Sequence, residues 1–541
     1  MERKHGQYVN PGNSGFQLIS NPEYVDKTML IDLLNQTIGT DKCLVCVSRP
    51  RRFGKSYAAK MLTAYYDKSC NSHELFDTKK IAVTKDYTKH LNQYNVICFD
   101  VTSFVSVARR LNRPLSDVPN MIEDALRKEL LESYSYLNPD MTLTESLLRC
   151  VEGTNEEPGR KFIFIIDEWD AVIREAKDDS NTQKQYLDLL REWFKNISFT
   201  PKVVAVAYMT GILPIKKDGS QSAISDFKEF TMIKPRQFGD FVGFTEDEVQ
   251  AKCTEHDMNF DTMKQWYDGY FFKNVGSVYN PNSVMQAIEN DDFDSYWTET
   301  SAAEGLMEYI SQDYNGLTKT IAELIAGIEV KVNTNGFAND LTTFKSKDDV
   351  LTLLIHLGYL AYDSEKKTVH IPNEEIRQEF QKSIREVKHD ATLRRLKESD
   401  QLFNDTIHEN EESVSAQIEK IHMEETAPLH YNKEDSLRSV IKLAYYTYRD
   451  HYVQWEELPA GVGYADVVYL PKYDFDYPIL VIEIKWNQEV ETAIDQIKDR
   501  HYPESFKGYG RDILLVGITY DKDAPAGKRK HICKIEKVIK D

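Results

Sequence analysis

Basic residues are scarce relative to acidic ones, and this absence limits the class of protein. The chain carries 67 Lys and Arg against 87 Asp and Glu, which leaves a net charge of −20. This balance excludes a general coat of positive charge and histone-like binding of nucleic acid, although it allows a small local basic site. Cysteine is also scarce and unpatterned, with seven residues in 541. A disulfide scaffold is therefore excluded, and the cysteine content suits the reducing cytoplasm.

Long apolar runs are absent as well. No stretch approaches the ~18–20 apolar residues that a membrane-spanning helix needs. The first fifteen residues have no apolar core of the signal-peptide kind. The close pair Cys43 and Cys46 lies in the apolar segment CLVCV, where a spacing of three puts the side chains on opposite faces of a strand. We interpret both as core thiols and expect a cytoplasmic protein without membrane contact.

Apolar segments alternate with helical ones in the first half of the chain. Strands are predicted at 43–47, 96–102, 162–170 and 203–211, and long helices at 118–135 and 182–195. Such alternation predicts a parallel sheet covered by helices on both faces. A chain of this length favours about three to four folding units. We assign residues 1–235 to one α/β domain of the P-loop NTPase class.

The middle of the chain is predominantly helical. Within residues 236–400, the pattern predicts a helix over 347–360, a two-stranded wing over 360–373 and a second helix over 374–387. This order is typical of a winged-helix module, which we interpret as a packing module rather than a reader of DNA.

The remaining residues form two parts. Residues 401–430 are charged and rich in glutamate, which predicts a helical linker. Residues 431–541 alternate again between helical and strand patterns, so we expect a second α/β domain with its own core.

A phosphate-binding loop is indicated where a predicted strand gives way to a helix. The segment Arg51-Arg52-Phe53-Gly54-Lys55-Ser56 places backbone N–H groups at a helix N-terminus, which favours anions. Lys55 suits the β- and γ-phosphates, and the Ser56 hydroxyl suits Mg²⁺. Arg49 stands where the general motif has its first glycine. Together with Arg51 and Arg52 it could neutralise phosphate charge, the alternative being solvated loop charges.

Two carboxylates follow the third predicted strand. Asp167, at the end of the apolar run Ile163–Ile166, is expected to hold Mg²⁺ through water. Glu168 is expected to orient and deprotonate the attacking water. Thr210 ends the next strand, where it either senses the γ-phosphate or caps the strand. This set predicts binding and hydrolysis of ATP.

Several separate segments resemble the AAA-ATPase-like family of bacterial proteins. They include YVDKTMLIDLL, SRPRRFGKS, FIIDEWDAVI, YMTGILPIK and WYDGYFF, and the resemblance covers residues 16–310. The loop of that family is usually RPRRFGK[ST], without the first glycine. The resemblance implies a P-loop fold of the AAA or signal-transducing NTPase sort.

A second group of polar residues is indicated near the C-terminus. Glu483 and Lys485 are two residues apart in the strand ILVIEIKW, so they project to the same side. Asp466, on the preceding strand, could join them through a hairpin. Asp466 and Glu483, with the backbone carbonyl of Ile484, form an oxygen donor set for Mg²⁺, and Lys485 could orient or deprotonate a water for attack on a phosphodiester. The alternative is an edge strand with alternating charge.

Three further residues could support this group. Glu434, in the preceding helix, could add a metal ligand or bind a metal-bound water, and Gln496, in the following helix, could support the site. Tyr502 could stack on a base or contact a phosphate.

Residues 428–536 resemble the PD-(D/E)XK nuclease superfamily, in the branch fused to the ATPase-like domain. The matching stretches include ELPAGVGYADVVYLPK, PILVIEIKW and AIDQIKDRHYP. The resemblance implies a restriction-endonuclease-like α/β fold. It also implies that Asp466, Glu483 and Lys485 are catalytic, with Glu434 and Gln496 as accessory residues.

Two functional hypotheses follow. The favoured one is an ATP-regulated, Mg²⁺-dependent nuclease that cleaves nucleic acid, with DNA as the expected substrate. The alternative is a nucleotide-dependent switch or assembly protein, acting through homo-oligomerisation, whose C-terminal domain binds DNA without cutting it.

Overall fold

The structure is a computed structural model of the whole chain. It describes residues 5–541 except 216, 219–220, 223, 225, 298–316, 326, 339–340, 342–343, 387–389, 426–440, 442–443, 446–451, 461–462, 473–476, 500–505, 507–510, 522, 524–529 and 539–541. The chain divides into two compact units, one of residues 1–302 and 331–379 and the other of residues 303–330 and 380–541.

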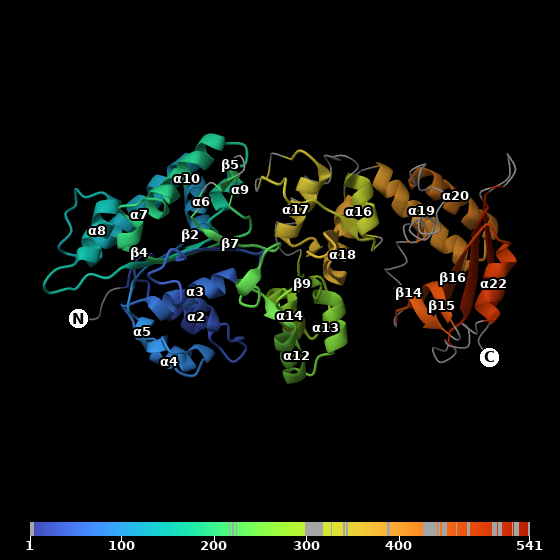
Figure 1. Cartoon of the computed structure of the whole chain (residues 1–541), viewed down its shortest axis with the longest axis horizontal. Coiled ribbons are helices and arrows are strands. Elements are labelled where there is room, and N and C mark those ends of the chain that lie inside the picture. Colours follow the sequence, from blue (N-terminus) through green and yellow to red (C-terminus); the bar gives the residue numbers. More distant parts are fainter. Residues whose placement is uncertain are drawn as a thin grey trace. The chain divides into compact units, whose positions relative to one another are not determined.

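A parallel five-stranded sheet forms the centre of the first unit (Figure 1). Its strand order is β2-β3-β4-β1-β7. The strands are β1 (Leu44–Ser48), β2 (Asn95–Asp100), β3 (Phe162–Asp167), β4 (Val204–Gly211) and β7 (Lys228–Phe230). The predicted second strand, 96–102, stops at Asp100 because the Asp100 side chain accepts the Thr102 N–H and begins a helix there.

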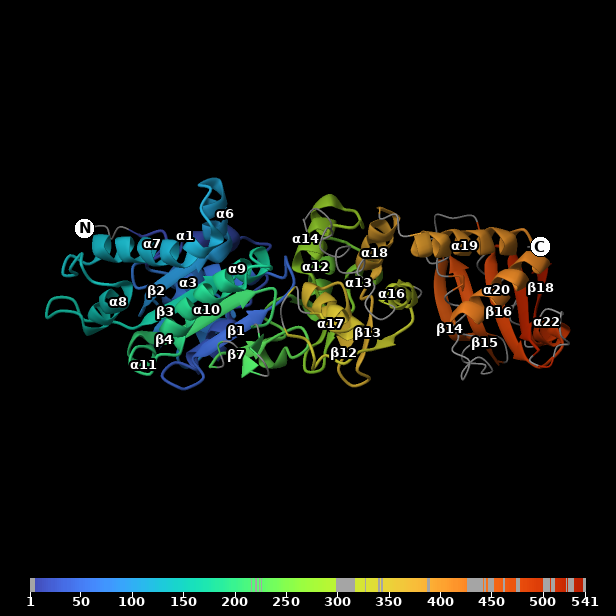
Figure 2. The same ribbon diagram turned by 90° about the horizontal axis from the view of Figure 1, so that it is seen from above.

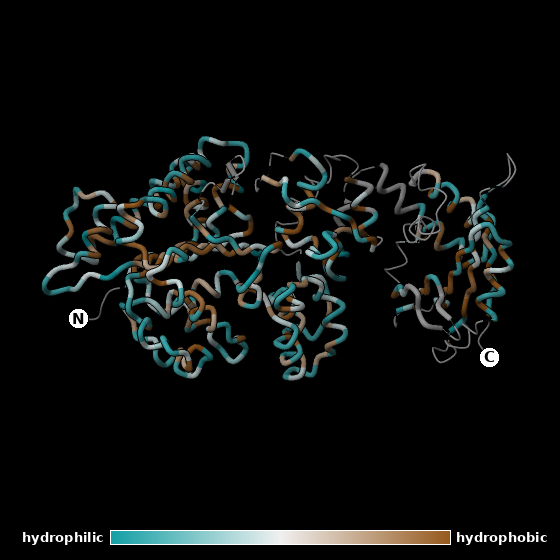
Figure 3. Tube along the Cα trace, viewed as in Figure 1, coloured by the Kyte–Doolittle hydropathy of each residue, from teal (hydrophilic) through white to brown (hydrophobic). Residues whose placement is uncertain are grey.

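Helices cover both faces of this sheet, as expected for a parallel sheet (Figure 1), and Figure 2 gives the view from above. On one face lie α6 (Val101–Arg110), α7 (Val118–Ser133), α8 (Leu143–Glu152) and α10 (Ser180–Phe194). The other face carries α3 (Lys55–Tyr66), with α1 (Ser14–Ile19) beside it and α2 (Met29–Asn35) nearby. The strands are the most hydrophobic segments of the trace (Figure 3). Every residue of β1, β3 and β4 is buried.

Alternation along β3 decides which side chains reach the phosphate loop. Phe162, Phe164 and Ile166 join the core beneath α7, α8 and α10. Because successive strand residues point to opposite faces, Asp167 points toward the face that carries α3. The same parity applies in β4, where Met209 joins that core and Thr210 faces α3.

The first unit continues with small helices and ribbons. A three-stranded sheet, in the order β8-β10-β9, consists of β8 (Phe244–Thr245), β10 (Gly276–Tyr279) and β9 (Tyr270–Phe272). Around it lie α12 (Glu246–Glu255), α13 (Phe260–Tyr267) and α14 (Pro281–Asn290).

The expected helix–ribbon–helix order follows. It consists of α17 (Lys347–Leu357), β12 (Ala361–Asp363), β13 (Thr368–His370) and α18 (Glu374–Glu386), with β11 (Val330–Lys331) beside β13. Its elements match the predicted winged-helix pattern.

A five-stranded mixed sheet in the order β14-β15-β16-β17-β18 forms the centre of the second unit. The strands are β14 (Tyr452–Ala460), β15 (Gly463–Pro471), β16 (Ile479–Trp486), β17 (Ile513–Tyr520) and β18 (His531–Val538). Helix α22 (Val490–Asp499) packs on β16, β17 and β18. Strands β14 and β18 were not predicted from the sequence.

Helices α19 (Asp390–Ile407) and α20 (Glu411–Glu425) also belong to the second unit, as does α16 (Leu317–Ile325). Helix α20 packs against β18, where the Ile535 N–H donates to the Glu411 side chain at 2.8 Å. The described part of the segment expected as a linker, residues 401–425, is therefore helical and packs on the sheet of the C-terminal unit. Among the described residues, no helix combines the length and apolarity needed to cross a bilayer.

Candidate functional sites

The loop between β1 and α3 folds back over the Lys55 side chain. Arg52 and Gly54 both have positive φ, at 66° and 91°, and this left-handed backbone turns the chain into the helix. The Lys55 ammonium is buried and donates to the carbonyl oxygens of Pro50, at 2.9 Å, and Arg49, at 3.3 Å. It lies 3.2 Å from Oε1 of Glu168. The predicted lysine therefore lies inside a loop that begins a helix, next to the predicted carboxylates.

Asp167 and Ser56 are brought together at the end of β3. A hydrogen bond links the Ser56 side chain to the Asp167 carboxylate. Burial raises the pKa of Asp167 to about 6, although this hydrogen bond opposes the rise. A hydroxyl and a buried carboxylate are hard oxygen donors, so this pair fits Mg²⁺.

Glu168 lies between two cations. Its Oε1 faces Lys55, and its Oε2 lies 2.5 Å from Nη2 of Arg174. Burial acts to raise the pKa of Glu168, but the charges of Lys55 and Arg174 outweigh burial and hold that pKa below its usual value. The residue expected to activate water is thus ionised and has two charged partners.

Three polar residues at this sheet edge were missed from the sequence. Asp100 ends β2 directly opposite Asp167 in the register of β2 and β3. Asp170 and Arg174 are joined by an ion pair of 3.1 Å. The spacing of four between Asp170 and Arg174 in DEWDAVIR was the available signal, since it is the spacing of neighbours on a helix.

Arg49 does not contribute to a phosphate site, contrary to one of the sequence interpretations. Its guanidinium is fully buried and donates to the carbonyl oxygens of Ser48, Phe230 and Phe238 at 2.9–3.2 Å. It also lies over the ring of Phe272, 5.2 Å from the centroid. Burial lowers the pKa of Arg49 to about 10. Arg49 is therefore neither a solvated charge nor a phosphate ligand, because its guanidinium donates to backbone carbonyls.

The remaining predicted nucleotide contacts have mixed surroundings. The Phe53 side chain is buried edge-to-face against Tyr270, with ring centroids 5.5 Å apart, so only the Phe53 backbone is available to a phosphate. Thr210 is buried, and its hydroxyl has no hydrogen-bond partner among the described residues. Its carbonyl accepts the Trp169 N–H at 3.0 Å. The hydroxyl therefore remains available on the α3 face, where the predicted role requires it.

Asp466, Glu483 and Lys485 converge in the second unit. Asp466 Oδ2 accepts the backbone N–H of Ile484 at 2.8 Å. The Lys485 ammonium lies 3.0 Å from Oε1 of Glu483, and the Gln496 amide donates to the same oxygen. Glu483 is only 2% exposed, so its charge depends on these partners. Two carboxylates beside a backbone carbonyl form a hard donor set, and these residues therefore fit Mg²⁺.

The sheet register explains this convergence. Val467 pairs with Ile482 in the antiparallel ladder of β15 and β16, so Asp466 lies next to Glu483 on the same face. Helix α22 packs on that face and carries Gln496 there. The other two predicted accessory residues, Glu434 and Tyr502, lie outside the described residues.

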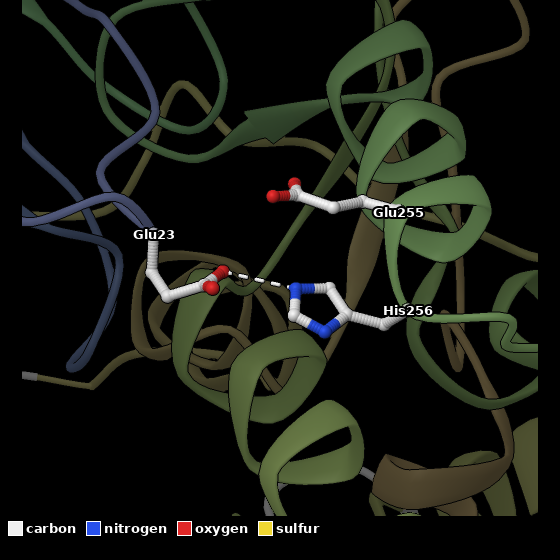
Figure 4. A group of neighbouring side chains, drawn as sticks. All are labelled: Glu23, Glu255 and His256. Carbon is white, nitrogen blue, oxygen red and sulfur yellow. Dashed lines mark hydrogen bonds and ion pairs between the residues drawn. The ribbon is translucent and has the colours of Figure 1, made fainter.

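A further cluster of possible metal ligands joins the chain near its start to α12. Glu23, Glu255 and His256 lie close together, and His256 Nε2 is 3.1 Å from the Glu23 carboxylate (Figure 4). Lys252 supplies the positive charge of this cluster, 2.6 Å from Glu23 and 2.9 Å from Glu255. Its hydrogen bond is the main reason that the pKa of Glu23 is lowered. We interpret the cluster as an ion-pair network that fastens the chain around Glu23 to α12.

Two family models match the chain in the places where these sites lie. Residues 13–220 match the model described as predicted AAA-ATPase, and residues 432–528 match the PD-(D/E)XK nuclease superfamily. Both resemblances expected from the sequence are confirmed. The chain therefore combines an AAA-ATPase-like domain with a nuclease-superfamily domain.

One relative matches nearly the whole chain. It is described as an uncharacterized protein in the vnfD 5′ region of Azotobacter chroococcum mcd 1, and it is 21% identical over 519 residues, 93% of each chain.

Solved structures match with low TM-scores. The Walker-type ATPase of Pyrococcus abyssi has a TM-score of 0.33 at 12% identity, with 66% of this chain and 94% of that chain covered. The replication initiator DnaA bound to AMPPCP and single-stranded DNA has a TM-score of 0.26 at 11% identity, with 68% and 92% covered. The Aeropyrum pernix ORC2 protein, in ADPNP–ADP complexes, has a TM-score of 0.27 at 11% identity, with 68% and 97% covered.

Proposed function

We propose that the protein is an ATP-hydrolysing, Mg²⁺-dependent nuclease in which the N-terminal site controls cleavage of nucleic acid at the C-terminal site. The observation that carries the nuclease assignment is the convergence of Asp466, Glu483 and Lys485 on one face of a buried sheet. A carboxylate and an ammonium are costly to bury without a task, and Glu483 is almost wholly buried. The alternating surface charge that would explain these residues in an exposed edge strand does not apply to β16, which is the central strand.

At the C-terminal site, the chain's own residues divide the work. Asp466 and Glu483 would hold Mg²⁺, and Gln496 fixes the Glu483 carboxylate by donating to it. Lys485 would orient the attacking water beside the scissile phosphate. Bound Mg²⁺ supplies Lewis acidity toward the phosphodiester and lowers the pKa of water. The substrate class is nucleic acid, since its phosphodiester is the group that this set of residues would attack, and DNA stays the expectation from the sequence.

At the N-terminal site, Lys55 would exchange its present partners for the phosphates of ATP. Those partners are two loop carbonyls and Glu168, which hold the ammonium beside the N-terminus of α3. Ser56 and Asp167 would hold Mg²⁺, and Glu168 would orient the attacking water. Homo-oligomerisation and a cytoplasmic location stay predictions from the sequence.

Cleavage assays test the nuclease assignment. Purified protein is incubated with plasmid, single-stranded DNA and RNA, with Mg²⁺ or with EDTA. We expect metal-dependent cleavage by the wild type and none by Lys485→Ala, with ATP binding unchanged in that variant. Equal cleavage by Lys485→Ala would overturn the site assignment. No cleavage of any substrate by the wild type would instead favour a nucleotide-dependent switch with a non-cleaving domain.

A further inference from the structure

Each oxygen of the Glu168 carboxylate contacts a different cation, and only one of these cations is anchored at its other end. Lys55 contacts Oε1 and Arg174 contacts Oε2. Both cations are largely buried, with Lys55 at 4% and Arg174 at 12% side-chain exposure. The carboxylate therefore bridges the phosphate loop and the short helix α9 (Ala171–Glu175).

Arg174 is anchored at its other end. Its Nε donates to Oδ2 of Asp170 at 3.1 Å, and Asp170 is completely buried. The same oxygen accepts the backbone N–H groups of Ile212 and Leu213, at 3.2 and 2.8 Å, directly after β4. A buried carboxylate with two backbone donors is fixed, so the guanidinium bound to it is fixed as well.

Lys55 is the partner that would leave when ATP binds. A lysine in this loop position serves the β- and γ-phosphates, so it cannot keep its present contact with Glu168 unchanged. The departure releases Oε1, whereas Oε2 keeps its anchored partner. The backbone of Glu168 has a φ of 49°, which fixes the start of the side chain.

We infer that Arg174 is a positioning residue for ATP hydrolysis: it holds one oxygen of Glu168 while the oxygen released by Lys55 turns to the attacking water. This inference rests on the proposed ATPase function. Asp170 is part of the same device, because it fixes the guanidinium relative to the end of β4. Buried ion pairs often add no net stability, because apolar residues of similar size can stabilise a protein as much. Stability alone therefore does not explain the linked charges of Asp170, Arg174 and Glu168, which favours a functional role.

Single-turnover hydrolysis and ATP binding, measured on the full chain, test this role. For Arg174→Ala we expect ATP affinity within about threefold of the wild type and a hydrolysis rate ~10–100-fold lower. Arg174→Lys should recover part of the rate, because it keeps the charge but not the fork of donors. Arg109→Ala is the matched control. Arg109, in α6, forms an exposed ion pair with Glu175, which lies in α9 beside Arg174, so the hydrolysis rate of this variant should equal that of the wild type.

A double-mutant cycle separates action through Glu168 from direct contact with phosphate. If Arg174 acts through Glu168, adding Arg174→Ala to Glu168→Ala causes no further loss of rate. A further loss of the same size would overturn the inference, as would a loss of ATP affinity with an unchanged rate in Arg174→Ala. Absence of hydrolysis in the wild type would overturn the proposed ATPase function and is distinguishable from either result.

Discussion

At the scale of single residues, Arg49 shows how the phosphate loop departs from the general motif. An arginine at the position of the first glycine suggests one more charge for the phosphates, yet its guanidinium is buried and donates to three backbone carbonyls. The loop shape is instead supplied by the left-handed backbone at Arg52 and Gly54. The arginine at the position of the glycine thus has a structural role, since it links the end of β1 to β7 and to the turn after β7.

Replacing Arg49 should therefore lower the stability of the fold more than it weakens ATP binding. Arg49→Ala leaves buried carbonyls without their donors and removes the contact with Phe272, so we expect a loss of about 3 kcal/mol in the free energy of unfolding. Urea denaturation measures this loss, with Arg52→Ala as the control. An Arg49→Ala protein of unchanged stability and weakened ATP binding would contradict our account.

The site residues that sequence reasoning identified are those whose role follows from local order. Lys55 and Ser56 follow from a strand–loop–helix pattern, and Glu483 and Lys485 from the two-residue period of a strand. Asp170 escaped because it accepts backbone N–H groups at the end of β4, about forty residues away in sequence. Arg174 contacts Asp170 and Glu168, which are near in sequence, but the spacing of four alone did not reveal that role. Arg49 was misassigned for the same reason, since its partners Phe230 and Phe238 are remote in sequence.

At the scale of elements, the phosphate loop packs against the helix–ribbon module that follows the ATPase-like sheet. Gly358 ends α17 with a φ of 86°, and a Cβ there would lie 2.7 Å from Pro50 and 2.8 Å from the Trp297 ring. The Tyr270 hydroxyl donates to the Gly358 carbonyl at 2.5 Å, and the same tyrosine packs on Phe53. The position thus requires glycine both for its backbone and for this close approach.

Gly358→Ala should disturb this packing. Backbone strain and overpacking together should cost about 2–4 kcal/mol of unfolding free energy. Because Pro50 and Phe53 belong to the phosphate loop, we also expect weaker ATP binding, measured with a fluorescent ATP analogue. Gly276→Ala is the matched control, since Gly276 has a φ of 91° but no neighbour near the added Cβ. Equal effects of both variants would mean that close packing at Pro50 is not the cause.

Glu375, in the first turn of α18, gives this module a pH dependence. It accepts hydrogen bonds from the Ser283 hydroxyl and the Tyr296 N–H, yet burial raises its pKa from 4.5 to about 8. Between pH 4.5 and about 8, Glu375 therefore keeps its proton in the folded chain and loses it in the unfolded chain. The resulting stability is complete below pH 4.5 and is lost as the pH rises toward 8.

Glu375→Gln removes this titration while keeping an acceptor for the same donors. We expect the variant to be more stable than the wild type at pH 8, with a difference that shrinks toward about pH 5. Thermal unfolding at several pH values measures the difference. A difference that is constant with pH, or that grows toward low pH, would exclude a raised pKa at Glu375.

Element prediction succeeded where apolar runs are continuous. It missed short strands, such as β7 and those of the β8-β10-β9 sheet, and the two edge strands of the second unit. β1, β3 and β4 are fully buried and consist mainly of apolar residues, and β16 begins with the apolar run Ile479–Ile482. The sequences of β14 (YVQWEELPA) and β18 (HICKIEKV) alternate with polar residues, and each lies at the edge of its sheet. They pair with β15 and β17, partners that lie beyond a turn or a longer connection, so the local pattern alone did not predict them.

At the scale of the whole molecule, the chain contains two sites in two compact units. Of the helical and winged region, residues 236–302 and 331–379 group with the ATPase-like sheet. The described residues of the expected linker group with the nuclease-like sheet. The ATPase-like unit is thus larger than its sheet, because the module that packs on its phosphate loop is part of it. The loop that carries Phe53 is therefore in direct contact with this module within one unit.

Control of cleavage by ATP is the central claim, and one assay tests it most directly. The rate of Mg²⁺-dependent cleavage is measured for the wild type and for Lys55→Ala, each with and without ATP, on the substrate that the wild type cuts. We predict that ATP changes the wild-type rate and leaves the Lys55→Ala rate unchanged. If ATP changed the Lys55→Ala rate as much as the wild-type rate, or changed neither, control through the N-terminal site would be contradicted.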